Sequence, residues 1–226
     1  MTNIEIYLEI GKKRTFAGAL AWPGWCRSGR DTASALQALV AYGPRYARLL
    51  ATTPLTFRAP TDTAAFVIIE QLAGTATTDF GAPDGVPTQD RQPLAATELQ
   101  RMELLLAAYW HAFDMAVQAA TGKALRKGPR GGGRDLAAIM DHVLAADTSY
   151  LARLAWKVAP SAGATIDVQL RDVRQAVLRA LNAAAYNGLP ERGPRGGSIW
   201  MPRYFVRRVA WHVLEHLWEI EDRMVG

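Results

Sequence analysis

The chain is poor in cysteine and has no long apolar run, and each shortage excludes a class of protein. Cys26 is the one cysteine among 226 residues, so an internal disulfide is excluded and a bound metal would need nitrogen and oxygen ligands. No run of about 18 apolar residues occurs, which argues against a membrane-spanning helix. The first residues, MTNIEIYLEIGKKR, lack the apolar centre of a signal peptide. We therefore expect a cytoplasmic protein without a membrane partner.

The remaining composition indicates a folded protein built from two unlike parts. Half of the residues are hydrophobic, which is enough for a well-packed core. The net charge of +5 is unevenly distributed. Residues 1–90 contain 8 basic and 8 acidic side chains, whereas residues 91–226 contain 18 and 13. This asymmetry predicts two domains, 1–90 and 91–226, with different roles.

The first part has the pattern of a small α+β domain. Residues 3–9 alternate apolar and polar side chains, as a half-buried strand does, and a second strand is expected at 15–20. A helix is expected at 32–50, with Asp31 or Thr32 as its cap. Segments 57–58 and 65–70 could add strands. The following stretch is rich in Gly, Pro, Thr and Asp, which predicts a linker or boundary near residues 80–92.

This part resembles the HicB antitoxin family. The resemblance is carried by TFAGALAWPGWCRSGRDTASALQALVAYGPRYARLL, in which a strand, a Pro-Gly turn, a Ser-Gly-Asp stretch and an Ala/Leu-rich helix follow in order. It covers roughly residues 4–50. It implies a small ββα(β) module related to the ribonuclease H fold, which we expect to be a structural or binding accessory.

The second part has the period of long helices. Apolar stripes predict helices at about 95–124, 135–158 and 167–185, and a fourth helix that begins after Met201-Pro202. Short joins between them are typical of an up-down-up-down four-helix bundle. The predicted fold class is thus α+β, with a small ββα(β) domain followed by this bundle.

Histidine is rare, and its placement is the strongest functional signal. Two of the four histidines, His212 and His216, are four residues apart on the expected last helix and would share one helix face. His142 lies at a comparable depth in the second helix, which in an up-down-up-down bundle runs parallel to the fourth. We therefore predict a three-histidine metal site with open positions for water or substrate. His111 is the histidine left over.

These positions resemble the DinB superfamily of four-helix metalloproteins, over about residues 92–226. That family places one histidine on its second helix and an H-x3-H pair on its fourth, which correspond here to His142 and to His212 with His216. The resemblance implies a divalent metal, foremost Zn²⁺ with Ni²⁺ or Fe²⁺ as alternatives. It also implies, as in several members, a low-molecular-weight thiol and transferase or isomerase chemistry.

Charged residues near this site suggest two further roles. Glu219 lies on the stripe of the histidine pair and could orient a ligand or act as a base. The pentapeptide GPRGG occurs at 128–132 and at 193–197, each time before a histidine-bearing helix. In the predicted bundle both copies would lie at one end and form an anion-attracting mouth, where the expected cofactor-binding residues are Arg130, Arg134, Arg195 and Arg203.

Three functions remain open at this stage. The first is a metal-dependent transferase, isomerase or hydrolase that acts on a small anionic or thiol-linked substrate. The second is a non-catalytic binding or regulatory protein whose bundle is stabilised by a metal. The third, nucleic-acid binding, is the least favoured, because the basic segments lack interleaved aromatic residues. A homodimer is compatible with each of these functions.

Overall fold

The computed structural model describes residues 3–127, 132–158, 161, 163–193 and 197–224. It is a mixed α+β structure, and the chain divides into two compact units, Met1–Gln92 and Pro93–Gly226. The division lies two residues beyond the predicted boundary. No helix of the described residues is long and apolar enough to cross a membrane.

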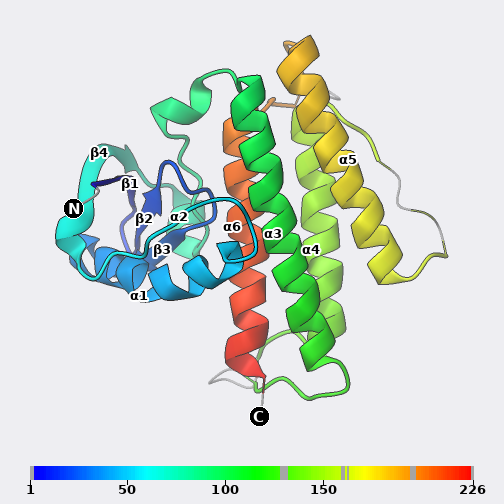
Figure 1. Cartoon of the computed structure of the whole chain (residues 1–226), viewed down its shortest axis with the longest axis horizontal. Coiled ribbons are helices and arrows are strands. Elements are labelled where there is room, and N and C mark those ends of the chain that lie inside the picture. Colours follow the sequence, from blue (N-terminus) through cyan, green and yellow to red (C-terminus); the bar gives the residue numbers. More distant parts are fainter. Residues whose placement is uncertain (1–2, 128–131, 159–160, 162, 194–196, 225–226) are drawn as a thin grey trace. The chain divides into compact units, whose positions relative to one another are not determined.

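The first unit is a four-stranded mixed sheet with one long helix. Strands β1 (Ile4–Ile10), β2 (Thr15–Ala19), β3 (Cys26–Gly29) and β4 (Phe66–Ala73) lie in the order β3-β2-β1-β4 (Figure 1). The β1–β2 and β2–β3 pairs are antiparallel, whereas β4 joins β1 in parallel. Helix α1 (Thr32–Leu50) occupies the predicted range and begins with an Asp31–Ser34 capping box. Residues 57–58, where a strand was considered, are not in a strand.

The stretch after β4, which includes the linker or boundary predicted near residues 80–92, is packed onto the sheet. It contains the short helix α2 (Ala76–Phe80) and ends in a 3₁₀ turn at Thr88–Arg91, just before the division between the units. The cause is Glu9, a fully buried carboxylate on β1. Glu9 accepts hydrogen bonds from the Thr78 hydroxyl and from the backbone amides of Asp84 and Gly85. A buried carboxylate needs such donors, so this polar segment is held in place.

The second unit is a bundle of four helices: α3 (Ala96–Ala120), α4 (Leu136–Leu151), α5 (Ile166–Asn187) and α6 (Pro202–Arg223). Pro202 starts α6 at a position where its missing amide hydrogen costs nothing. Sixteen of the 22 residues of α6 are buried. Helix α6 therefore supplies a large share of the bundle core.

The helix directions differ from the predicted up-down-up-down order. Arg223 at the end of α6 donates to the carbonyl of Arg134 just before α4, and the Trp200 amide just before α6 donates to the carbonyl of Arg153 just after α4. Helices α4 and α6 are therefore antiparallel, not parallel (Figure 1).

The other helix pairs complete the order. Arg203 near the start of α6 pairs with Glu98 near the start of α3, so those two helices run the same way. The end of α3 and the start of α5 line one cleft, so α3 and α5 are antiparallel. The order is up-down-down-up. Helices α4 and α5 are therefore parallel, and the chain between them has to return along the bundle. The joins expected from the sequence did not reveal this difference from the up-down-up-down order.

Candidate metal centre

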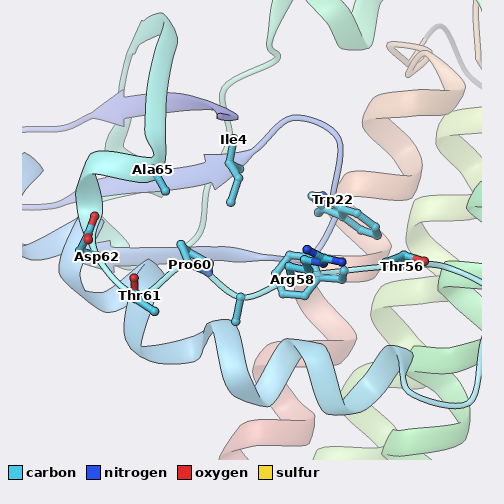
Figure 2. Close-up of a pocket in the computed structure, with 10 residues that line it drawn as sticks. Ile4, Trp22, Thr56, Arg58, Pro60, Thr61, Asp62 and Ala65 are labelled. Atoms are coloured by element: carbon cyan, nitrogen blue, oxygen red, sulfur yellow. The ribbon is translucent and has the colours of Figure 1, made fainter. Parts of the chain in front are cut away.

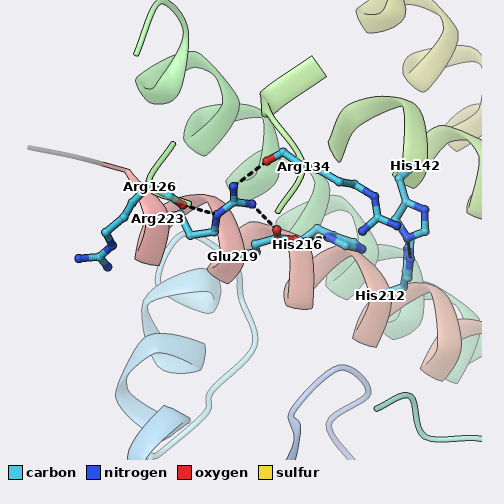
Figure 3. Close-up of polar contacts among 7 residues, drawn as sticks. All are labelled: Arg126, Arg134, His142, His212, His216, Glu219 and Arg223. Carbon is cyan, nitrogen blue, oxygen red and sulfur yellow. Dashed lines mark hydrogen bonds and ion pairs between the residues drawn. The ribbon is translucent and has the colours of Figure 1, made fainter. Parts of the chain in front are cut away.

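Three imidazoles from two helices meet inside the bundle. His142 projects from α4, and His212 and His216 project from one face of α6. The Nε2 atoms of His142 and His212 are 3.2 Å apart. The three imidazoles each offer one nitrogen, and these nitrogens all lie within 4.8 Å of one another. Figure 3 shows the two α6 side chains and His142 converging from opposite helices.

The antiparallel helices, rather than parallel ones, bring these side chains to one level. The ends of α4 and α6 are joined by the Arg223–Arg134 hydrogen bond. His142 lies eight residues after Arg134 and His216 seven before Arg223. At a rise of about 1.5 Å per residue these are distances of about 12 and about 11 Å from the same end of the bundle. The predicted trio of His142, His212 and His216 is therefore brought together, although the predicted helix directions were wrong.

The separations suit a shared ion. Two nitrogens that each lie about 2.1 Å from one tetrahedral ion are about 3.4 Å apart, close to the 3.2 Å between His142 and His212. The third nitrogen lies within 4.8 Å of these two. A set of three imidazoles suits Zn²⁺, Ni²⁺ or Fe²⁺ and not the hard cations Ca²⁺ and Mg²⁺. The trio could hold such a metal ion.

The surroundings of His142 and His212 favour the neutral imidazole, which is the form that ligates metals. His212 and His216 are almost fully buried. Burial, followed by the neighbouring imidazoles and the positive charges of Arg208 and Arg134, holds the pKa of His212 well below its usual value. The pKa of His142 is lowered in the same way, first by burial.

Glu219 lies directly behind His216. The Nδ1 atom of His216 donates to the Glu219 carboxylate over 2.9 Å, which leaves the Nε2 lone pair of His216 free to ligate. The second carboxylate oxygen accepts from Arg223. These hydrogen bonds, with that from His216 first, lower the pKa of Glu219. Both oxygens are thus engaged in a way that fits the orienting role, and the role as a base stays a prediction.

Arg223 ties this carboxylate to the end of the bundle, and sequence reasoning missed it. Its Nε donates to the carbonyl of Arg126 over 2.9 Å and its Nη2 to the carbonyl of Arg134 over 2.7 Å (Figure 3). The spacing of Glu219 and Arg223, four residues on one helix, is the signal that could have found it.

The predicted basic mouth is not a single surface. Because α4 and α6 are antiparallel, Arg134 just before α4 and Arg203 at the start of α6 lie at opposite ends of the bundle. Arg203 pairs with Glu98 and donates to the carbonyl of Pro93, far along α6 from the trio. Arg130 and Arg195 lie outside the described residues. The prediction of one rim formed by all four arginines was therefore wrong.

Of the two predicted arginines that the structure describes, Arg134 is the one that lies near the trio. Its positive charge lowers the pKa of both His142 and His212, and Figure 3 shows its side chain extending toward His142. Within the described part of the chain, its guanidinium makes no hydrogen bond or ion pair. It is exposed and hence available to an incoming anion.

Aromatic side chains flank the trio toward the start of α6. The ring of Tyr150 lies 5.8 Å from that of His212, and the ring of Trp200 lies 5.3 Å from that of Tyr150. The Arg208 guanidinium is 5.8 Å from the centre of the Tyr150 ring. His111, by contrast, is exposed on α3 and is not part of the trio.

Compared with known protein families, with curated proteins and with solved structures, the chain shows no significant match. The DinB-like and HicB-like resemblances therefore rest on the sequence motifs alone.

Proposed function

We propose that residues 93–226 form a DinB-like metal centre that acts on a small anionic or thiol-linked substrate, as a transferase, isomerase or hydrolase. The observation that carries this proposal is the convergence of three imidazoles, two buried and one half-buried, with the Nε2 atoms of His142 and His212 3.2 Å apart. Three protein ligands leave a coordination position for a substrate, which is typical of catalytic rather than closed sites.

Each residue has a distinct role in this proposal. His142, His212 and His216 hold a divalent cation, which when bound acts as a Lewis acid and lowers the pKa of a coordinated water or thiol. Glu219 fixes the His216 tautomer by accepting its Nδ1 proton in a hydrogen bond. Arg134 attracts the anionic group of the substrate, because its exposed guanidinium is close enough to lower the pKa of two of the ligands.

The experiment has a metal step and a ligand step. Protein purified without added metal or chelator is analysed for its elements, and the expected result is about one equivalent of Zn, Ni or Fe, in keeping with the nitrogen ligands. The protein is then loaded with Co²⁺ and titrated with a series of small thiols. Direct ligation of a thiol gives a sulfur-to-cobalt charge-transfer band, and the thiol that produces it is tested as a co-substrate.

A second candidate is a metal that only stabilises the bundle. It is favoured by the chain of hydrogen bonds from His216 through Glu219 and Arg223 to two backbone carbonyls, which connects the site to the bundle end. Bound metal together with an unchanged Co²⁺ spectrum across all thiols would select this candidate. Protein that contains no metal and acquires none on incubation with Zn²⁺ would contradict both.

A further inference from the structure

The first unit contains a cavity that has no part in the metal centre. Its volume is about 580 Å³, which is within the range of small-molecule sites. It lies between the start of β1, the turn after β2 and the chain that follows α1. All of its lining belongs to the first unit: Ile4, Trp22, Thr56, Phe57, Arg58, Ala59, Pro60, Thr61, Asp62 and Ala65 (Figure 2).

One wall is a set of aromatic rings that support one another. The rings of Trp22 and Phe57 are 5.0 Å apart and nearly perpendicular. Behind them, the rings of Trp25 and Tyr46 each lie 4.9 Å from Phe57. Both are fully buried. Edge-to-face pairs of this kind are favourable beyond their buried area, so the wall is formed before a ligand arrives.

The polar groups of the buried rings are already bonded. The Trp25 indole donates to the carbonyl of Leu39 over 3.0 Å, and the Tyr46 hydroxyl donates to that of Pro23 over 3.2 Å. These two rings therefore present apolar surface only. Trp22 and Phe57 are half-buried although large and apolar, and they face the cavity.

The charged groups of the lining are one arginine and one aspartate. The Asp62 carboxylate accepts from the Ala64 amide over 2.8 Å and caps the turn at Thr63–Ala65. Arg58 is exposed, and within the described residues its guanidinium has no hydrogen bond or ion pair. Figure 2 shows Arg58 near the Trp22 end of the cavity and Asp62 near the other end. Arg58 is thus the charged group of the lining that is available to a ligand beside the aromatic wall.

We propose that this cavity binds an aromatic carboxylate, with the flat apolar body against Trp22 and Phe57 and the carboxylate paired with Arg58. A guanidinium can bind a carboxylate through two parallel hydrogen bonds, which fixes the orientation of the ligand. The proposal is independent of the metal centre, because no metal-site residue lines the cavity.

The test uses 2-naphthoate and its uncharged analogue 2-naphthamide with the full-length protein. Binding is followed by NMR chemical shifts of the Trp22 indole and the Arg58 side chain. A ligand of this size with ordinary efficiency has a Kd on the order of 1 mM. The naphthoate is expected to bind about tenfold more tightly than the amide, since a hydrogen-bonded ion pair is lost in the amide.

Three variants locate the effect. R58Q is expected to remove the preference for the carboxylate and leave naphthamide binding unchanged, whereas F57A weakens both ligands. R48Q, a change of an exposed arginine at the end of α1 outside the lining, is expected to bind like the unaltered protein. Equal affinities for the two ligands, or shifts that leave Trp22 unmoved at about 10 mM ligand, would overturn the proposal.

Discussion

The imidazoles of His142 and His212 meet at 3.2 Å although 70 residues separate them in the chain. Each contributes one of the three nitrogens of the candidate metal centre, so each should be necessary for it. We expect H142A and H212A to lower the bound metal to less than about one tenth of the unaltered protein, because a two-imidazole site is far weaker. Elemental analysis measures this loss.

The fourth histidine provides the matched control for that experiment. His111 is exposed on α3 and outside the trio, so H111A should retain the full metal content. A folded H212A variant, verified by circular dichroism, that keeps its metal would show that the ion binds elsewhere.

The hydrogen bond between Glu219 and His216 predicts a loss of metal affinity when the carboxylate is removed. E219Q should weaken Zn²⁺ binding by about 10- to 100-fold, as changes in groups that orient metal-bound histidines do. Competition with a chromophoric chelator measures the affinity, and E191Q, at an exposed loop residue, serves as the control. Unchanged affinity combined with lost turnover would instead support Glu219 as a general base.

Arg134 should select for charge on the ligand. In Co²⁺-loaded protein we expect mercaptosuccinate to bind more tightly than the uncharged 2-mercaptoethanol. R134Q should lower the ratio of the two affinities by about tenfold. The comparison is read from the charge-transfer band. R192Q, a change of an exposed arginine in the α5–α6 connection, should keep the preference. A preference that survives R134Q would assign the anion to another cation, such as Arg208.

Asp147 predicts a dependence of stability on pH. Its carboxyl on α4 is fully buried, and burial raises its pKa to about 7, with Arg174 offsetting only part of the effect. Neither oxygen has a hydrogen-bond partner among the described residues. Because the folded pKa lies above the unfolded value of 3.8, the folded state loses stability as the pH rises from about 4 to about 7.

The variant D147N separates this effect from other titrations. The shift of about 3 units corresponds to about 4 kcal/mol, so D147N should gain on the order of that amount relative to the unaltered protein between about pH 4 and about pH 8. Urea unfolding at the two pH values measures the difference. A constant difference between the two proteins would mean that Asp147 is ionised throughout.

The sheet of the first unit makes a separate prediction about packing. A methyl group on Gly18 would collide with the Tyr7 ring, which is almost fully buried. G18A should therefore lower the free energy of unfolding by about 1–3 kcal/mol, as overpacking in cores does. G132A places its methyl group in open space and should have little effect. Equal stabilities in urea for both variants would contradict the packing described for Tyr7.

The sequence was sufficient for most of the helices and for the histidine trio, but not for the arrangement of the helices. Helix α1 occupies its predicted range because its capping residue and apolar spacing are local signals. Strand β3 was not predicted, since Ser28 and Gly29 favour turns and only the pairing with β2 makes this segment a strand. The packed segment after β4 depends on the burial of Glu9, which no local pattern reveals.

The helix directions illustrate the same limit. Joins of similar composition precede α4 and α6, and nothing local in them states that these helices are antiparallel. The histidine trio was nevertheless predicted, because His142 lies near the middle of its helix. A residue at mid-height stays near the same level whichever way the helix runs.

The distance along the chain between His142 and His212 has a mechanical consequence. An ion held by both would close a loop of 70 residues, in a chain whose one cysteine can form no internal bridge. Ties that close long loops restrict the unfolded chain most strongly. In this bundle the ion would serve as the cross-link that disulfides provide in secreted domains, and chelation would cut it without breaking a covalent bond.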